Sequence, residues 1–296
     1  MADSKDTEGT KVPKGTKVKK KKGSSRPDLA TILGLIIGVG GVVVGLLMEG
    51  GRIQDVAQVS AGIIVLGGTF GAVLVTNPLS VVIRAAKQAT CLFMDRVEPI
   101  TATIDELIEY ATIARRQGIV SLEQQAEAIA DPFLQKALNL AIDGVDMDQI
   151  RSMMELEITV MEQNLEAEAR VFEAAGGYSP TIGIIGAVLG LIQVMKNLAN
   201  IDEVGRGIAV AFVATVYGVA SANLFFLPAA GKLHARVRQT VRLRELMLEG
   251  VLSISEGMNQ KLIRTKLDAF ARDEPKPAKP RQAKEKVSGN PVAAEG

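Results

Sequence analysis

Four long stretches of the chain contain no Asp, Glu, Lys or Arg: Leu29–Met48, Val56–Ile83, Ala174–Met195 and Gly207–Gly231. About 20 apolar residues in a helix suffice to cross a hydrocarbon core roughly 30 Å thick. Each stretch is long enough, and the second still spans if it ends at Pro78. A buried helix of a soluble domain would explain one such stretch, but not four. The pattern therefore predicts four transmembrane helices.

The segment between the second and third spans has the periodicity of amphipathic helices. One apolar stripe recurs at three- and four-residue spacing: Ile100, Ile104, Leu107, Ile108 and Ala111. A long acidic helix is predicted from Asp146 towards the third span, with its apolar side formed by Ile150, Met154, Met161, Leu165 and Phe172. Helix starts are predicted at Ser121, which with Gln124 fits a capping box, and at Asp131 before Pro132.

A helical stripe also continues beyond the fourth span, through Leu233, Val237, Val241, Leu248, Val251, Ile254, Met258 and Leu262. The last two spans and their extensions are therefore expected to form continuous rods. The two ends of the chain have a different composition. The first 28 residues are polar and include the run Lys19-Lys20-Lys21-Lys22, and the end from Asp273 is rich in Pro, Lys and Ala. Both compositions are typical of disordered tails.

Basic residues near the spans predict the orientation, because Lys and Arg in short flanking segments stay in the cytoplasm. Bases precede the first span and follow the second and fourth spans, whereas the two short turns between paired spans are poor in bases or charge-balanced. We therefore expect both termini and the long middle segment in the cytoplasm.

The predicted fold is all-α: a polytopic membrane protein with four transmembrane helices and a helical cytoplasmic domain. The expected divisions are a basic tail (1–28), transmembrane hairpin 1 (29–78), a cytoplasmic helical domain (79–175), transmembrane hairpin 2 (176–231), a cytoplasmic C-terminal helix (232–271) and a disordered tail (272–296). Glycines four residues apart, at 34/38, 41/45, 67/71 and 186/190, favour close packing of helices or copies.

Composition argues against catalysis. The chain has one cysteine, Cys91, and one histidine, His234, so neither a disulfide within the chain nor a zinc site is expected. It contains no G-x-x-x-x-G-K-[ST] phosphate loop and no arrangement of nucleophile and base, so we predict no enzyme, no cofactor, no catalytic residue and no metal site. The basic and acidic residues are segregated along the chain, and no nucleic-acid partner is expected.

The spans hold polar residues but no ionisable ones. The polar side chains of the last two spans include Ser179, Thr181, Thr215, Tyr217, Ser221 and Asn223. Transporters and proton pumps normally keep ionisable residues inside their spans. A self-sufficient pump or a solute transporter is therefore disfavoured. The chain is either a scaffold or one half of an ion path whose carboxylate comes from a partner.

Four fragments, in order on the four-span frame, resemble the MotA family, the ion-channel stator subunits of the bacterial flagellar motor. They are Ala114-Arg115-Arg116-Gln117-Gly118-Ile119-Val120-Ser121-Leu122-Glu123, Ser179-Pro180-Thr181-Ile182-Gly183-Ile184-Ile185-Gly186-Ala187, Ala214-Thr215-Val216-Tyr217-Gly218 and Phe225-Phe226-Leu227-Pro228. The resemblance covers roughly residues 29–267. It implies a flagellar stator subunit in the bacterial inner membrane that converts ion flow into torque.

The resemblance also implies roles for single residues. Arg115 and Glu123 fall where the family presents charges to the rotor protein FliG, although a solvated charge and an acid favoured by a helix dipole explain them equally well. Pro180 and Pro228 match prolines near the cytoplasmic ends of the last two spans, where a helix start and a kink are the simpler explanations. By resemblance, we expect both prolines to couple ion events in the pore to movement of the stalks, which are the cytoplasmic extensions of the last two spans.

Thr215 and Ala187 are the expected ion-pathway residues. By resemblance Thr215 lines a pore opposite an aspartate on the single span of a MotB-like partner, although a threonine in a span often bonds only to its own helix. Sodium-driven relatives tend to have a threonine at the position of Ala187. A methyl group supplies no oxygen ligand to a hard cation, so we predict proton coupling.

The implied assembly is a homo-oligomer, a pentamer by resemblance, around a MotB-like subunit. The nearest rival is the related ExbB/TolQ class, which energises outer-membrane transport and typically has a single span before its cytoplasmic domain. A plain membrane scaffold is the other alternative, in which Thr215 and Pro180 are dispensable for motility.

Overall fold

The computed structural model describes residues 26–92, 94–95 and 100–271. Of the predicted tails, 1–28 and 272–296, residues 1–25 and the whole of 272–296 lie outside the described residues. Helices form almost all of the described chain. Two short strands, β1 (Arg26–Pro27) and β2 (Met94–Asp95), pair antiparallel. The all-α prediction is confirmed.

The helices follow one another in the order α1 (Leu29–Met48), α2 (Ile53–Val56), α3 (Val59–Gly62), α4 (Gly68–Thr76), α5 (Leu79–Cys91), α6 (Ile100–Gln117), α7 (Glu123–Ala126), α8 (Pro132–Ile142), α9 (Met147–Lys196), α10 (Ile201–Ser221), α11 (Leu227–Ser255) and α12 (Gln260–Ala271). Two π-helical turns, η1 (Ile63–Gly67) and η3 (Ala222–Phe226), connect α3 to α4 and α10 to α11 without a break. A 3₁₀ turn, η2 (Ile119–Leu122), precedes α7.

Four helical segments are long and apolar enough to cross a membrane: Leu29–Met48, Val59–Thr76, and parts of Met147–Lys196 and Ile201–Ser255. The first has the bounds that the sequence predicts. The second ends before Asn77, whose extended backbone and the following Pro78 stop the helix. No residue of α1 is buried in the chain, although its side chains are almost all apolar. A helix that is apolar on every side and uncovered by protein suits a lipid environment.

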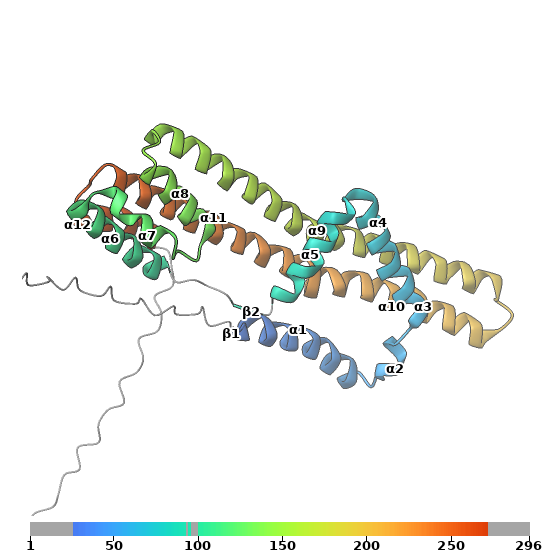
Figure 1. Ribbon diagram of the computed structural model, residues 1–296. Coiled ribbons are helices and arrows are strands. Elements are labelled where there is room, and N and C mark those ends of the chain that lie inside the picture. Colours follow the sequence, from blue (N-terminus) through green and yellow to red (C-terminus); the bar gives the residue numbers. More distant parts are fainter. Residues whose placement is uncertain (1–25, 93, 96–99, 272–296) are drawn as a thin grey trace, which may run out of the picture. The chain divides into compact units, whose positions relative to one another are not determined.

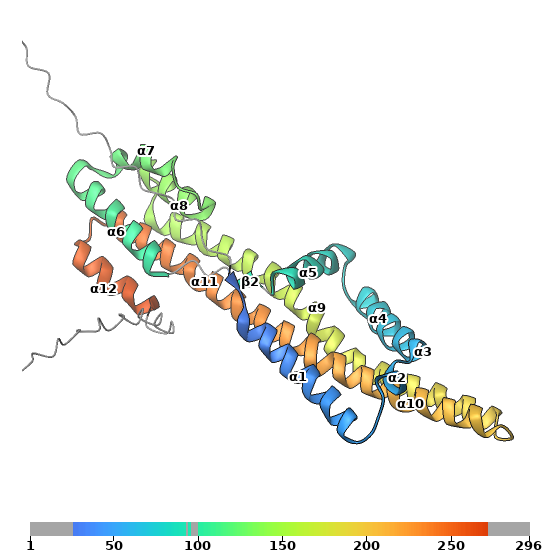
Figure 2. The same cartoon turned by 90° about the horizontal axis from the view of Figure 1, so that it is seen from below.

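The described residues divide into two compact units: those from 26 to 95 with 152–243, and those of 100–151 with 244–271. In the first unit the later part of α9 runs beside α10 and the beginning of α11, and α4 and α5 lie against them (Figure 1). The apolar core of this unit gathers side chains from α4, α5, α9, η3 and α11: Val73, Ala85, Leu92, Ala169, Val171, Phe172, Ala175, Phe226, Ala229, Ala230 and Leu233. Figure 2 shows α1 along the same bundle, where Leu224 of η3 approaches Gly38.

The second unit is a small helical domain made of α6, η2, α7, α8, α12, the start of α9 and the end of α11. Its largest fully buried side chains are Ile104, Leu107, Leu122, Leu134, Leu138, Ile150, Leu246, Leu252, Ile263 and Leu267. Asp131 caps α8 by accepting from the backbone N–H groups of Phe133 and Leu134, and Pro132 occupies the first turn, so this predicted helix start is confirmed. The Asp131 carboxylate also pairs with Arg244 of α11.

Two local predictions in this domain are wrong. Ser121 does not cap a helix: its hydroxyl donates to the Gly118 carbonyl oxygen at 2.6 Å inside η2, and α7 begins only at Glu123. The rod after the fourth span does not run through Leu262. It ends at Ser255, Gly257 turns with a φ of 68°, and α12 follows. In α12 the buried positions are Ile263 and Leu267, whereas Leu262 is 55% exposed.

Candidate functional site

Glycine and alanine build the contact between α9 and α10. A Cβ atom on Gly183 would lie 2.9 Å from the Ala214 carbonyl oxygen, and one on Gly190 would lie 2.8 Å from the Gly207 carbonyl oxygen. From α10, a Cβ atom on Gly218 would lie 2.6 Å from the Ser179 carbonyl oxygen. The two backbones therefore touch along a seam that only small residues allow.

Thr215 lies at this seam. Its Cα atom is 3.5 Å from the place that a Cβ atom of Gly183 would take. The Thr215 hydroxyl is part-buried and donates to the Ala211 carbonyl oxygen of its own helix at 3.3 Å. Ala187 follows Gly183 by one helical turn and is also part-buried. The predicted ion-pathway residues thus lie on the two helices that form the seam, and the hydroxyl has a partner in its own backbone.

A hydroxyl pair crosses the seam beside Pro180. The Ser179 and Ser221 oxygens are 2.6 Å apart. The Ser221 oxygen also lies 2.7 Å from the Tyr217 carbonyl oxygen, and either hydroxyl can be the donor in the pair. Ser179 is fully buried. Pro180 lies inside α9, where its ring removes a backbone N–H, and a Cβ atom on Gly218 would be 3.2 Å from its Cα. The predicted coupling proline is therefore packed directly against α10.

Pro228 occupies a different setting. It is the second residue of α11, and Leu227 separates it from the π-helical turn η3. A proline inside a helix clashes with the carbonyl four residues earlier, and a wider turn at that place relieves the clash. The two prolines that the sequence singles out thus lie in two different backbone environments, one in a continuous α-helix and one after a π-turn.

Tyr217 ties the seam to the first hairpin. Its hydroxyl donates to the Val56 carbonyl oxygen at 2.7 Å, and its ring lies against Gly62 of α3. Ala61 and Val65 pack against Val213 and Ala214 in the same region. The same carbonyl oxygen also accepts from the Gln58 N–H at 3.0 Å, so this oxygen at the end of α2 has two donors.

An ion pair joins the beginning of α1 to α11. The Lys232 ammonium pairs with the Asp28 carboxylate and donates to the Thr31 hydroxyl at 2.6 Å and to the Leu92 carbonyl oxygen at 2.7 Å. Asp28 caps α1 by accepting from the Thr31 N–H. The hydrogen bond from Lys232, with the bonds from Thr31, lowers the pKa of Asp28 from 3.8 to about 2 against the opposing effect of burial. Lys232 thus holds three segments of the first unit together.

Charged groups also join α9 to its neighbours. Glu168 of α9, whose side chain is 8% exposed, accepts from the Arg84 Nε of α5 at 3.0 Å. His234 of α11 lies between two carboxylates of α9: its Nδ1 is 3.3 Å from Glu166 Oε1 and its Nε2 is 3.0 Å from Glu173 Oε1. These contacts connect the helices just beyond the two prolines.

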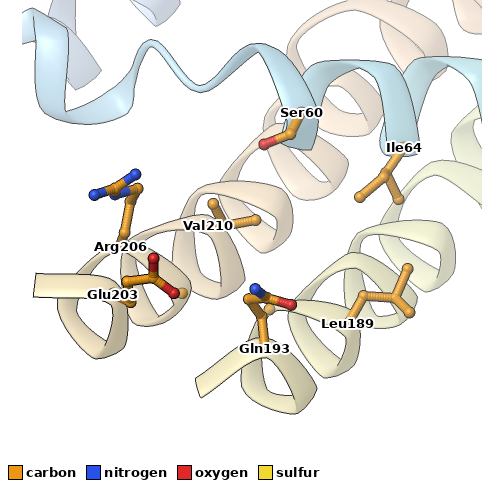
Figure 3. A pocket seen from close by; sticks show the side chains of 9 residues that line it. Ser60, Ile64, Leu189, Gln193, Glu203, Arg206 and Val210 are labelled. Carbon is orange, nitrogen blue, oxygen red and sulfur yellow. The ribbon is translucent and has the colours of Figure 1, made fainter. Parts of the chain in front are cut away.

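A cavity of about 290 Å³ opens among α3, α9 and α10 near the turn that joins the last two (Figure 3). Ile64, Leu189 and Val210 supply apolar walls, and Ser60, Gln193, Glu203 and Arg206 supply polar ones. Within the part of the chain that the structure describes, no three His, Cys, Asp or Glu side chains converge in a way that would hold a metal ion.

The predicted rotor-facing residues lie in the second unit. Arg115 is exposed in the last turn of α6, where a cation is favoured by the helix dipole, and Glu123 is exposed at the first position of α7. Both residues flank η2. Arg115, Ile119 and Met258 help to line a cavity of about 230 Å³.

Comparisons with known proteins agree with this architecture. Residues 32–116 match the model of the motility protein A N-terminal region, and residues 125–246 match the model of the MotA/TolQ/ExbB proton channel family. Motility protein A of Bacillus subtilis is 37% identical over 81% of this chain and 89% of its own length. The chain belongs to the MotA/TolQ/ExbB proton channel family.

Solved structures place it within the MotA branch of that family. The C. jejuni MotAB structure is 32% identical, with a TM-score of 0.79 over 85% of this chain and 99% of the matched chain. The flagellar MotAB stator complex of Bacillus subtilis is 35% identical, with a TM-score of 0.75 over 81% and 95% of the two chains. This MotA-type chain is a flagellar motor stator subunit and a multi-pass membrane protein. The match of the first hairpin to the motility protein A N-terminal region separates it from the ExbB/TolQ alternative.

Several contacts of this MotA-type chain were missed by reasoning from the sequence. The hydroxyl pair at Ser179, the Tyr217 bond, the Lys232 ion pair and the His234 contacts each join residues that are 42 to 204 positions apart. One signal in the sequence pointed towards these contacts. A polar residue in an apolar segment, or in a segment whose charges all have the same sign, needs a partner. This signal indicates that a partner exists and does not say which residue supplies it.

Proposed function

We propose that several copies of this chain, five by family resemblance, surround a MotB-like partner in the bacterial inner membrane and form a proton channel with it. The observation that carries this proposal is the α9–α10 seam, which holds hydroxyls at Ser179, Thr215 and Ser221 but no ionisable side chain. A proton path through lipid needs a titratable group. A single-span partner with an intramembrane Asp supplies it.

The proposed orientation places both termini and the helical domain of residues 100–151 in the cytoplasm. Bases follow the second span at Arg84 and Lys87 and the fourth at Lys232, Arg236 and Arg238. The segment that joins the last two spans, from Lys196 to Arg206, has these two bases balanced by Asp202 and Glu203. A positive cytoplasmic flank is the normal arrangement. A reporter fused at Arg52 that reads cytoplasmic would contradict it.

In this mechanism the partner's Asp is protonated and deprotonated next to Thr215, and each change alters how α9 and α10 pack. Pro180 and Pro228 pass the movement to the stalk parts of α9 and α11. Support comes from the contact of Pro180 with Gly218, because a shift at the seam must move the proline with it.

Torque is proposed to reach FliG through Arg115 and Glu123. Both side chains are exposed and flank the same 3₁₀ turn. Arg115→Glu and Glu123→Lys should each reduce torque, and charge reversal in the rotor protein should restore it. Arg116→Glu is the matched control, since Arg116 is equally exposed in the same helical turn. Unchanged torque in the Arg115 and Glu123 variants refutes the rotor-facing role.

Proton coupling is proposed from Ala187, whose methyl group offers no oxygen to a sodium ion. Swimming should persist in sodium-free medium and stop when an uncoupler collapses the proton gradient. Sustained swimming with an intact sodium gradient and a collapsed proton gradient would overturn this choice of ion. Thr215→Ala should slow swimming more than Thr215→Ser, because the serine variant keeps the hydroxyl.

A further inference from the structure

The only histidine of the chain joins the two stalk helices. Glu166 and Glu173 lie seven residues apart on α9 and therefore on the same face, two turns apart. Between them His234 of α11 inserts its ring, with Nδ1 3.3 Å from Glu166 Oε1 and Nε2 3.0 Å from Glu173 Oε1. The His234 side chain is only 19% exposed. The ring is thus held on two sides by the neighbouring helix.

Only a charged ring can donate to both carboxylates at once. An ionised carboxylate only accepts hydrogen bonds, and a neutral imidazole has a single N–H to donate. Both contacts are hydrogen bonds only when both ring nitrogens carry hydrogen. When the ring loses one proton, a nitrogen lone pair faces a carboxylate oxygen at bonding distance, and that contact becomes repulsive. The joint between α9 and α11 therefore depends on one proton.

The surrounding charges come from four elements. The other charged groups on the two helices of the joint, and on the elements that are ion-paired with them, are Arg170 and Glu168 on α9, Arg84 and Lys87 on α5, Asp28 at the start of α1, and Lys232, Arg236 and Arg238 on α11. Two of the acids are engaged elsewhere, Glu168 with Arg84 and Asp28 with Lys232. The acids that touch the ring are Glu166 and Glu173, so they are its direct electrostatic partners.

The joint lies directly beyond both prolines. Glu173 precedes Pro180 by seven residues on α9, and His234 follows Pro228 by six residues on α11. Any sliding or rotation of one stalk relative to the other on that side of the prolines stretches the two ring contacts. The two ring contacts therefore oppose independent movement of α9 and α11 on this side of the prolines.

We propose that Glu166, His234 and Glu173 form a proton-dependent clamp, which locks α9 to α11 when the ring is charged and loosens as cytoplasmic pH rises. Histidine is the side chain whose charge ordinarily changes between pH 5 and 8. In the proposed motor, protons leave the channel into the cytoplasm. The clamp would make the stalks respond to the proton concentration on that side of the membrane. That link to torque rests on the stator function proposed above, whereas the clamp itself does not.

The test measures the separation of the two stalks in the assembled stator complex. Spin labels are placed on the exposed positions Gln163 of α9 and Gln239 of α11, with Cys91→Ser as background and labelled subunits diluted by unlabelled ones. Between pH 5.5 and 8.5 the wild-type distance distribution should change from narrow to broad, completing most of the change within about two pH units as a single titrating group does.

Three variants define the clamp. His234→Arg keeps a charge and several donors at every pH, so the distribution should stay narrow, whereas His234→Gln should stay broad. Arg238→Gln is the matched control, because it removes a positive charge from an exposed site on the same helix and should titrate like the wild type. A wild-type distribution that does not change with pH, or a His234→Gln variant that titrates like the wild type, overturns the proposal.

Swimming speed supplies the second readout. With cytoplasmic pH set by a permeant weak acid, the pH dependence of speed should be flatter in His234→Arg than in the wild type. If the distances titrate as expected but none of the variants affects motility, the clamp stands and its link to the stator mechanism fails. If the distances do not titrate, the clamp fails whatever the swimming speed.

Discussion

Replacing Gly218 by alanine tests the seam between α9 and α10 most directly. The new Cβ atom would lie 2.6 Å from the Ser179 carbonyl oxygen, 3.1 Å from the Gly183 Cα and 3.2 Å from the Pro180 Cα. All three neighbours are backbone atoms of one helix, and real Cβ atoms essentially never come closer than 3.0 Å. The two helices must therefore separate by at least about 0.4 Å near Ser179, because packed backbones cannot yield locally.

Two effects of opposite sign decide the result. Replacing a helical glycine by alanine ordinarily stabilises by about 1 kcal/mol through backbone entropy. Forcing an extra methyl group into a filled contact costs about 1–3 kcal/mol. We expect a net loss of about 1 kcal/mol or more in the free energy of unfolding, which lowers the melting temperature by roughly 2–4 °C for each kcal/mol in a chain of this size.

The assay is thermal unfolding of the purified complex, with Gly71→Ala and Gly205→Ala as matched controls. A Cβ atom at either control position meets no other atom of the chain within 4 Å. These controls should keep or raise the melting temperature, so the sign of the shift, and not only its size, distinguishes the positions. A Gly218→Ala complex that melts as high as the controls would refute the account of the seam.

Three further predictions concern single polar contacts. Lys232→Met should destabilise the protein by about 1–2 kcal/mol at pH 7, where Asp28 is ionised, as followed by chemical denaturation. Because the pKa of Asp28 is lowered from 3.8 to about 2, the difference between variant and wild type should shrink as pH falls from 4 towards 2, and a constant difference would contradict the ion pair. Tyr217→Phe should cost about 0.5–1.5 kcal/mol in the same assay, because the Val56 carbonyl oxygen loses one of its two donors and keeps the bond from the Gln58 N–H, whereas Tyr178→Phe should cost less. Burial and the bond to Glu106 raise the pKa of Tyr110, so its stabilising contribution should fall once pH rises above about 10, and Tyr110→Phe should reduce the loss of helical circular dichroism in alkali.

The features that the sequence alone determined are local or periodic. The first span has its predicted bounds at Leu29 and Met48, because a run without charges over that length is sufficient for a membrane helix. The start of α8 at Asp131 and Pro132 was also predictable, since a cap needs only the residues next to it. The family itself was recognised from four short fragments spread over the chain, and the comparisons confirm it.

The same kind of local signal failed where a competing bond was stronger. Ser121 has the residue type and spacing of a cap, yet its hydroxyl bonds the Gly118 carbonyl oxygen within a 3₁₀ turn. The stripe that pointed to Leu262 lost its register at Gly257, whose positive φ restarts the helix with a different face inward. Hydrophobic spacing predicts neither the 3₁₀ turn at Ser121 nor the end of α11 before Gly257. Both helix boundaries depend on the turn between the packed helices.

Only the tertiary structure decided which helix faces meet. Glycine pairs occur in several spans, but Gly190 faces the backbone of α10 and Gly186 faces the Ala214 side chain, whereas a Cβ atom added to Gly67 or Gly71 would have open space around it. The ring of His234 finds two carboxylates more than 60 positions away, and Lys232 finds Asp28 at the other end of the chain. Periodicity determines how long a helix is and which side it buries. The partner of a polar side chain depends on the register between packed helices, which the sequence of one helix does not contain.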